Sequence, residues 1–224
     1  YNDSLNLSDY VSDAEDADSA LTWKAENNAN INIAINQTTK IANFTALANW
    51  SGSENIKFTA NDTSGLTDND TILVTVNPVN DPPSFNSSNP IANLTWPEDI
   101  VNSSINLAKH FYDIDNANLN FTATNTANVS IYIENATGKV NITPNANWSG
   151  IAYAVFTAKD ASGLTASSNN ITLNVTPVND APAFTGAIPQ WKWPEDIVNN
   201  SLDLTQYFSD IDKDALKHNY TLVN

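Results

Sequence analysis

Carboxylate side chains gather at a few places in this chain, at spacings that suit the binding of a hard cation. Asp-x-Asp pairs occur at residues 113–115 and 210–212, and Asn-Asp pairs occur at 80–81 and 179–180. Several carboxylates that converge without Lys or Arg repel one another. Ca²⁺, which takes about six to eight oxygens from carboxylates, amides and backbone carbonyls, relieves that repulsion. The alternative is that these residues form solubilising turns, because Asp and Asn favour turns for backbone reasons.

The acidic residues recur because the whole chain repeats itself with a period of 97 to 99 residues. Pro-Val-Asn-Asp at 78–81 returns at 177–180, Asn-Trp-Ser-Gly at 49–52 returns at 147–150, and Trp-Pro-Glu-Asp at 96–99 returns at 193–196. A period of this length is a whole domain rather than a solenoid repeat. We therefore expect repeat 1 over residues 1–79, a complete repeat 2 over 80–178 and the N-terminal part of repeat 3 over 179–224.

Repeat 1 lacks the stretch that carries Trp-Pro-Glu-Asp in the other two repeats, so we expect its first strand to be missing. The chain also begins without Met or a secretory signal. One interpretation is that the sequence is a window from a longer protein. The other is a subunit whose third repeat donates its first strand to the open first repeat of a neighbouring copy.

Alternation of apolar and polar residues with a period of two predicts strands throughout, as at Ile31, Ile33 and Ile35. In repeat 2 we expect strands near residues 91–96, 104–111, 119–124, 129–134, 139–143, 151–159 and 169–177. Seven short strands in one repeat indicate a two-sheet sandwich, and a polar outer face indicates antiparallel sheets. The predicted fold class is all-β, with antiparallel Greek-key sandwiches of about seven strands each. Trp50 and Trp148 are expected to plug one end of their sandwiches.

The composition excludes several classes of partner and of chemistry. A formal net charge of −16, with no Arg among nine basic residues, argues against binding to nucleic acid or to an anionic membrane surface. No apolar run approaches the ~20 residues that span a bilayer, so we expect no direct membrane insertion in this segment. Without Cys there is no thiol nucleophile, and His110 and His218 occupy unrelated places in their repeats. We predict that the chain is not an enzyme.

Asn-x-Ser/Thr sequons are nearly threefold more frequent than the composition explains. In a strand such a sequon shows both polar side chains on one face. We therefore predict N-linked glycans and an extracellular location, against the alternative that Asn and Thr are only the favoured polar residues of the outer faces. Asn49 and Asn147 also begin sequons. The predicted glycosylation sites are Asn2, Asn6, Asn36, Asn43, Asn61, Asn69, Asn86, Asn93, Asn102, Asn120, Asn128, Asn135, Asn141, Asn170, Asn174, Asn199 and Asn219.

The chain resembles the tandem cadherin-like and immunoglobulin-like repeats of bacterial and archaeal surface proteins. The resemblance rests on Phe-Thr-Ala-x-Asp-x-Ser-Gly at 156–163, on Pro-Val-Asn-Asp before each repeat boundary, and on Asp-x-Asp before the third strand. It implies Ca²⁺ at each junction between repeats, held by the linker residues, the Asp-x-Asp pair, the loop Asp and an early Glu. Carried over, the junction of repeats 1 and 2 would use Asn80, Asp81, Asp113, Asp115 and Asp160. The junction of repeats 2 and 3 would use Glu98, Asn179, Asp180, Asp210 and Asp212.

These observations predict a non-catalytic extracellular glycoprotein segment that forms a stalk, filament or adhesin shaft. Ca²⁺ would rigidify the junctions, and the array as a whole fits an archaeal cell surface best. The expected partners are neighbouring repeats or identical subunits, together with other cell-surface proteins or glycans. Two alternatives remain open: a filament or S-layer subunit assembled by strand exchange, and a carbohydrate-binding module.

Overall fold

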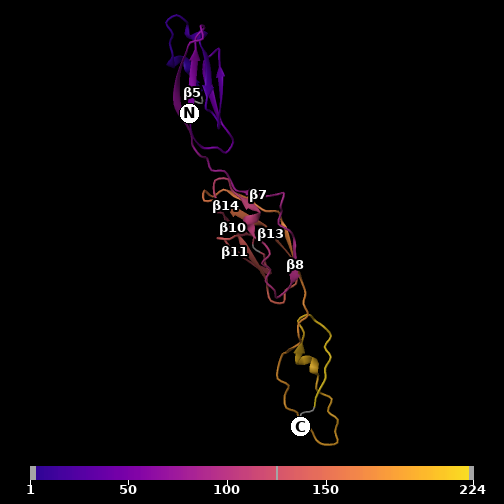
Figure 1. Ribbon diagram of the computed structural model, residues 1–224. Coiled ribbons are helices and arrows are strands. Elements are labelled where there is room, and N and C mark those ends of the chain that lie inside the picture. The colour runs from indigo at the N-terminus through magenta and orange to yellow at the C-terminus, as the bar shows by residue number, and fades with distance from the viewer. Residues whose placement is uncertain (1–3, 125, 222–224) are drawn as a thin grey trace. The chain divides into compact units, whose positions relative to one another are not determined.

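The computed structural model describes residues 4–124 and 126–221. The chain divides into two compact units, Tyr1–Asn80 and Asp81–Asn224, and some of their strands are labelled in Figure 1. In the described residues the only helices are short 3₁₀ turns, and none is long or apolar enough to cross a membrane. The all-β fold class predicted from the alternation is confirmed.

The first unit is a sandwich of two three-stranded sheets. One sheet has the order β1 (Ser4–Asn6), β4 (Ile41–Ala46), β3 (Ile31–Asn36), and the other has the order β2 (Thr22–Glu26), β5 (Gly52–Asn61), β6 (Thr67–Val76). All the pairings are antiparallel. The 3₁₀ turns η1 (Leu7–Tyr10) and η2 (Asp18–Ala20) join β1 to β2. The core is built from the alternate inward side chains, among them Ile31, Ile56 and Phe58.

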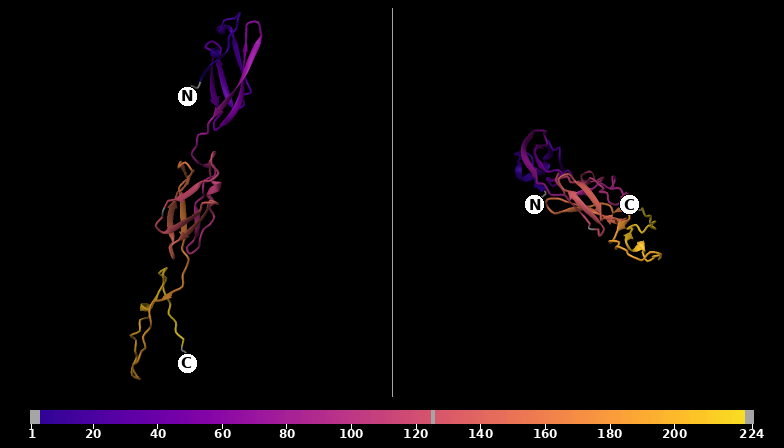
Figure 2. Two further views of the ribbon diagram at one scale, coloured as in Figure 1. Left: turned by 90° about the vertical axis from the view of Figure 1, so that its left-hand side faces the viewer. Right: turned by 90° about the horizontal axis from the view of Figure 1, so that it is seen from below.

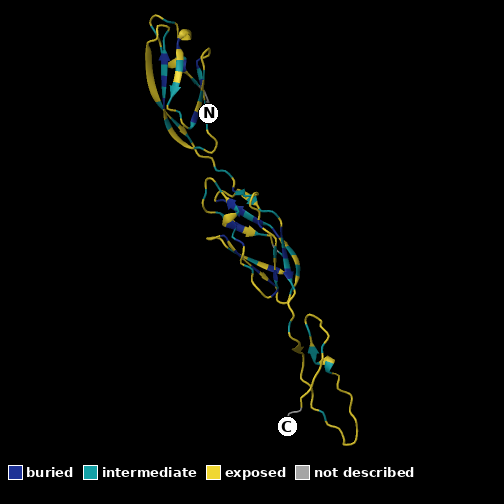
Figure 3. Ribbon diagram, turned by 45° about the vertical axis from the view of Figure 1, so that its right-hand side comes forward, coloured by how far each residue is buried: buried dark blue, intermediate teal, exposed yellow. Residues whose placement is uncertain are grey.

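The second unit contains a larger sandwich between residues 84 and 176. Its strands are β7 (Ser84–Phe85), β8 (Leu94–Pro97), β9 (Phe111–Tyr112), β10 (Asn120–Ala123), β11 (Val129–Glu134), β12 (Lys139–Pro144), β13 (Gly150–Ala154), β14 (Phe156–Lys159), β15 (Thr165–Ser167) and β16 (Ile171–Thr176). These strands form two three-stranded sheets, in the orders β10–β14–β15 and β13–β16–β8. They also form two two-stranded sheets, β7–β9 and β11–β12. Figure 3 shows buried residues along these strands, and Phe156, Ile171 and Leu173 are wholly buried.

One pairing differs from the antiparallel pattern that the alternation suggested. β8 lies parallel to β16, with Leu94 opposite Leu173 and Trp96 opposite Val175. The first long strand of the repeat therefore pairs with its last strand. A parallel pair needs a crossover connection, which here is the rest of the sandwich.

The expected strand over residues 104–111 is interrupted. Only isolated bridges at Asn102 and Asn106 precede the 3₁₀ turn η3 (Leu107–Lys109), and β9 follows it. The Asn106 side chain accepts a hydrogen bond of 3.0 Å from the N–H of Ala108. A local side-chain bond of this kind offers the backbone an alternative to the sheet ladder. The expected strand over 151–159 is likewise divided into β13 and β14 at Val155.

Each Asn-Trp-Ser-Gly motif folds its indole over its own glycine. Gly52 and Gly150 have φ of 149° and 148°, in the region that favours glycine. A Cβ on Gly150 would lie 3.0 Å from Cζ2 of Trp148, and one on Gly52 would lie 3.1 Å from Cζ2 of Trp50. Both indoles pack against the core of their own sandwich, as expected for core plugs.

The last part of the second unit has few regular elements. The pair β17 (Ala183–Phe184) and β18 (Phe208–Ser209) and the 3₁₀ turn η4 (Leu204–Gln206) account for all of them in the described residues after 176. Phe184 and Phe208 stack with ring centroids 5.2 Å apart. Most other side chains there are exposed, and Figure 2 shows the segment as largely irregular chain.

Candidate cation sites at the acidic loops

The linker before repeat 3 is bonded to the Asp-x-Asp loop of that repeat. The backbone N–H of Asp180 donates to Oδ2 of Asp212 at 2.6 Å. Within the loop, Oδ1 of Asp210 accepts from the N–H of Asp212 at 2.9 Å and of Asp214 at 3.4 Å. These bonds hold the loop as a turn, which is the local preference of Asp. The Asp180 main chain and two loop carboxylates therefore meet within the second unit.

Glu98 enters the same region from the end of β8. Its N–H bonds the carbonyl of Thr176 at 2.9 Å, and its Oε1 accepts from the N–H of Val178 at 2.9 Å. The side chain is only 3% exposed. Its Oε2 is buried and has no hydrogen-bond partner among the described residues. A buried carboxylate oxygen without a partner is costly unless a cation or a donor joins it.

The carboxylate of Asp180 is surrounded by negative charge. Burial raises the pKa of Asp180 above its ordinary value, and the charges of Asp212, Asp99, Glu98 and Asp210 raise it further. Its Oδ2 is buried and also lacks a partner in the described part of the chain. Like charges held together favour the neutral form of one group, or a bound cation. Either event would lower the free energy of this region.

The linker before repeat 2 is bonded in the same way. The N–H of Asp81 donates to Oδ2 of Asp115 at 2.6 Å, and Oδ1 of Asp113 accepts from the N–H groups of Asp115 and Asn116, both at 2.8 Å. Oδ2 of Asp113 is buried and has no partner among the described residues. The two linkers of the second unit thus carry the same hydrogen-bond pattern one repeat apart.

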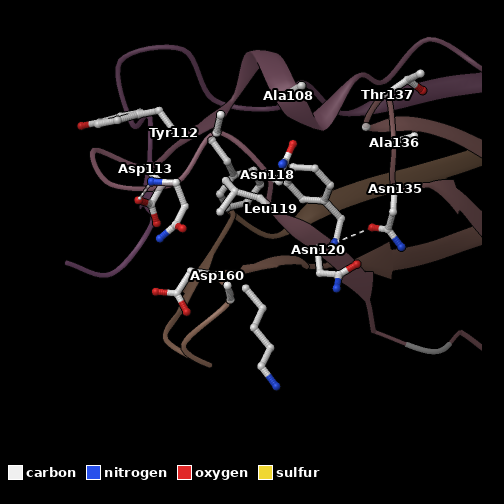
Figure 4. Close-up of a pocket in the computed structure, with 17 residues that line it drawn as sticks. Ala108, Tyr112, Asp113, Asn118, Leu119, Asn120, Asn135, Ala136, Thr137 and Asp160 are labelled. Carbon is white, nitrogen blue, oxygen red and sulfur yellow. Dashed lines mark hydrogen bonds between the residues drawn. The ribbon is translucent and has the colours of Figure 1, made fainter. Parts of the chain in front are cut away.

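Asp160 lies on the same side of a pocket as Asp113. Figure 4 shows both side chains at one end of this pocket, with Asn135 at the other end, and its volume is about 600 Å³. Asp160 is 5% exposed, and its Oδ1 accepts from the N–H of Leu164 at 2.7 Å. This bond closes the loop between β14 and β15. It orients the carboxylate that the sequence assigned to the junction of repeats 1 and 2.

The side-chain oxygens of the two acidic clusters fit a hard cation better than any other ligand. Carboxylate oxygens dominate both clusters, and neither His nor Cys belongs to them. In residues 4–124 and 126–221, however, no three acidic or histidine side chains are arranged to hold a metal ion as they stand. The buried unpartnered oxygens of Glu98, Asp113 and Asp180 are the groups that a cation would satisfy. Closing a coordination shell would require small shifts of the loop carboxylates.

The predicted ligands fall into three groups. The charges of Glu98, Asp210 and Asp212 all raise the pKa of Asp180, and Asn179 donates to the carbonyl of Asp180 through Nδ2 at 3.0 Å. Asp81, Asp113 and Asp115 are linked by hydrogen bonds, and Asp160 shares a pocket with Asp113. Asn80 ends the first unit, so its relation to these residues stays a prediction.

Sequence reasoning did not count Asp99 as a ligand. Its charge acts on Asp180, its Oδ1 accepts from the N–H of Asn147 at 3.2 Å, and its φ is 61°. Asp196, its counterpart in repeat 3, has the same φ. Such a backbone conformation is uncommon for a residue other than glycine. The recurrence of Pro-Glu-Asp in both repeats was the signal that could have identified it.

The predicted glycosylation sites are accessible where the structure describes them. Asn2 lies outside the described residues. The other predicted asparagines are exposed or half-buried, and none is fully buried. Asn43 and Asn141 lie on the outer faces of β4 and β12, beside the core residues Ala42 and Ile142. Their accessibility permits glycosylation, and occupancy stays a prediction.

Comparison with known proteins gives one family match and several matches to structures. Residues 80–176 match the family described as "Bacterial Ig domain". No curated protein matches the chain. Mouse cadherin-23 EC22-24 is 17% identical, with a TM-score of 0.50, covering 71% of this chain and 53% of that one. Protocadherin gamma B7 extracellular cadherin domains 1–4 are 16% identical, with a TM-score of 0.48, covering 76% and 46%.

An endo-fucoidan hydrolase of glycoside hydrolase family 107 also matches, at 18% identity and a TM-score of 0.34, over 69% of this chain and 27% of that one. That likeness is too low to support catalysis. The chain spans about half the length of the two cadherin structures. The likeness to mouse cadherin-23 concerns the fold alone. Together with the match over residues 80–176, it supports a sandwich fold of the immunoglobulin-like and cadherin-like type.

Proposed function

We propose that the chain is a non-catalytic segment of an extracellular stalk or adhesin shaft, in which Ca²⁺ stiffens the junctions between repeats. The observation that carries the proposal is the buried Oε2 of Glu98, which has no partner among the described residues, in a side chain whose charge raises the pKa of Asp180. Tandem sandwiches joined by short proline-bearing linkers suit a spacer. Neighbouring repeats, identical subunits and other surface molecules are the expected partners.

A cation here would tie three separate parts of the second unit together. Glu98 belongs to the end of β8, Asp180 follows β16, and the Asp210–Asp212 pair lies before the irregular end of the third repeat. Carboxylates from all three would supply oxygen ligands. Crosslinking them through one ion would restrict motion of the linker. A cation at Asp81, Asp113, Asp115 and Asp160 would act in the same way on the preceding linker.

Calorimetric titration with CaCl₂ and thermal melts in 5 mM CaCl₂ or EGTA test this proposal. At the affinities of extracellular modules, 5 mM Ca²⁺ would stabilise the bound unit by about 1 to 2 kcal/mol. Glu98→Gln keeps the shape and removes the charge, so it should abolish most of this gain. Glu134→Gln, on an exposed strand residue of the same unit, is the matched control. Identical melts with and without Ca²⁺ would refute the calcium part of the proposal.

Glycans on the outer faces would shield the shaft. We propose that exposed sequons such as those at Asn43 and Asn141 carry N-linked glycans in the native cell, which would also locate the chain outside it. Intact-protein mass spectrometry of native material, compared with Asn43→Gln and Asn141→Gln variants, would count them. Unmodified mass at both positions would contradict this part.

A further inference from the structure

The pocket that contains Asp113 and Asp160 lies within repeat 2, and its volume is about 600 Å³. A space of this size is typical of sites that hold a small molecule. Figure 4 shows Leu119 between the acidic end of the pocket and the end at Asn135. Gly138, in the turn between β11 and β12, also lines it, and alanine and aromatic side chains form much of the remaining wall. The pocket therefore combines an acidic end with a partly apolar wall.

Lys40 of the first unit is the counterpart of Gly138. The carbonyl of Lys40 accepts from the N–H of Leu7 at 2.9 Å, and the carbonyl of Gly138 accepts from the N–H of Leu107 at 2.8 Å. Both residues also donate their own N–H to the carbonyl four residues earlier, at 2.7 and 2.8 Å. Their φ angles are 60° and 71°, in the left-handed region. The two backbone positions are thus equivalent, and they differ in the side chain.

The side chain of Lys40 occupies the place that is open in repeat 2. It is only 4% exposed, and its Nζ donates to the carbonyl of Leu21. Leu21 is the counterpart of Leu119, because two residues after each of them an aromatic residue donates its N–H to a side-chain amide oxygen, at 2.9 and 2.6 Å. The Lys40 side chain therefore runs between the positions equivalent to Gly138 and Leu119, both of which line the pocket in repeat 2.

This place can hold a buried ammonium in the first unit, and repeat 2 offers an ammonium more. Besides the Leu119 backbone, the pocket has the carboxylates of Asp113 and Asp160 in its wall. Oδ2 of Asp113 is buried and has no partner among the described residues. Hydrogen bonds from an ammonium to a carboxylate are stronger than those to a neutral carbonyl. Lys159 also lines the pocket, but it is exposed and extends along the turn toward Gly163.

We propose that the pocket of repeat 2 binds a primary ammonium group carried on an aliphatic chain, the chemistry of a lysine side chain or of a free diamine. The ammonium lies at the carbonyl of Leu119, as that of Lys40 does at Leu21, and within the field of the two carboxylates. The aliphatic chain lies along the apolar wall. Binding requires no Ca²⁺, and the tests are made in EGTA, so this proposal and the calcium function can fail separately.

Calorimetric titration of the native chain with 1,5-diaminopentane tests the site. We expect saturable binding with a Kd of about 1 mM or below, and no detectable binding of 1,5-pentanediol, which has the same length without charge. Asp160→Asn keeps the oxygen that accepts from the N–H of Leu164 and removes one charge, so it should weaken binding at least about tenfold. Glu134→Gln removes one charge from an exposed residue outside the pocket and is the matched control. Equal affinities in the two variants, or no saturable binding to the native chain, would overturn the proposal.

A second probe, Nα-acetyl-lysine N-methylamide, distinguishes the two sources of the ammonium. Affinity within about tenfold of that of the diamine would assign the pocket to a lysine side chain of a partner protein. A greater loss would assign it to a free diamine, whose second ammonium the acidic end would hold. Binding of both probes to Asp160→Asn as tightly as to the native chain would exclude this pocket for either source.

Chemical rescue in the first unit tests whether the place selects an ammonium. Lys40→Gly keeps the left-handed backbone, which glycine adopts readily, and removes the side chain. It should lower the melting temperature of the first unit, and n-butylammonium should restore part of the loss. Lys40→Met keeps an aliphatic side chain in the place, so n-butylammonium should have no such effect on it. Equal rescue of Lys40→Gly by n-butanol would show that the place selects apolar volume and not charge, which would contradict the proposal.

Discussion

The main chain of Asp180 and the carboxylate of Asp212 are joined by a hydrogen bond of 2.6 Å, and Asp81 and Asp115 repeat that bond at the same length one repeat earlier. The acceptor is in both cases the second Asp of an Asp-x-Asp pair. The bond uses the N–H of Asp180, and the carboxylate of the same residue is exposed to the charges of Glu98 and the other acidic residues, which raise its pKa. One structural bond therefore presents the charge that a cation would neutralise.

Substitutions of Asp212 should separate these two roles. Asp212→Asn keeps an oxygen acceptor for the N–H of Asp180 and removes the charge, so Ca²⁺ affinity should fall at least about tenfold with little change in stability without Ca²⁺. Asp212→Ala should also lose about 1 kcal/mol of stability in EGTA, because the hydrogen bond is gone. Calorimetric titrations and melts of both variants measure the difference. Native Ca²⁺ binding in both would exclude Asp212 as a ligand.

The stability of the first unit should depend on the ionisation of Asp16. The N–H and then the hydroxyl of Thr63 donate to Oδ2 of Asp16 at 3.0 and 2.7 Å, and these bonds hold the pKa of Asp16 below its ordinary value of 3.8. The folded form therefore prefers the charged carboxylate, and the contribution is complete above that ordinary value. It is lost as the pH falls through the lowered pKa.

Melting curves from pH 6 to pH 2.5 check this dependence. Asp16→Asn should melt below the native chain at pH 6, and the two melting temperatures should converge at the acid end. Asp18→Asn, at an exposed position nearby, serves as the control and should follow the native chain. A constant gap between Asp16→Asn and the native chain over this range would contradict the assignment.

Gly150→Ala should destabilise the second sandwich by roughly 1 to 3 kcal/mol. The new Cβ would have to accept φ near 148° and would meet the Trp148 ring at 3.0 Å. Gly186→Ala is the matched control, because nothing lies within 4 Å of the Cβ that it adds. Chemical denaturation followed by Trp fluorescence measures both. Equal midpoints for the two variants would show that the indole can move aside at no cost.

Hydrogen exchange should distinguish β6 from β16. Among the described strands β6 pairs only with β5, whereas β16 pairs with both β13 and β8, so the outer amides of β6 should exchange at least about tenfold faster than the corresponding amides of β16. Exchange measured by mass spectrometry on the native chain at low concentration gives this comparison. Equal protection of the two strands in the free chain would mean that the edge of β6 is already covered.

Much of the fold could be predicted from the local alternation of apolar and polar residues. The alternation at Ile31, Ile33 and Ile35 predicted β3, and the same pattern predicted β11 and β12 almost to the residue. The strand expected at 104–111 did not form. The side-chain oxygen of Asn106 accepts a hydrogen bond from the N–H of Ala108 and caps a 3₁₀ turn instead. Alternation reports which side chains are apolar, and it does not report a competing side-chain bond.

The sequence could predict which acidic residues form clusters, but it could not predict how their side chains are arranged. The repeated Asp-x-Asp and Asn-Asp motifs singled out Asp113, Asp180 and Asp212, and their role as ligands stays a prediction. The part played by Asp99 was missed because it depends on a positive φ that brings its charge toward Asp180. Asp196 has the same φ in repeat 3, so this conformation accompanies the Pro-Glu-Asp motif, but the motif alone does not show that the charge of Asp99 acts on Asp180.

The parallel pairing of β8 with β16 also has a mechanical consequence. The chain enters β8 at one end of the pair and leaves β16 at the other, so tension along the polypeptide would slide the two strands past each other. All the bonds of that pair would then share the load, instead of opening one after another as in a peeled hairpin. Once the two-residue β7–β9 pair had yielded, repeat 2 would resist extension through this short ladder. Such resistance would suit the extracellular shaft proposed above.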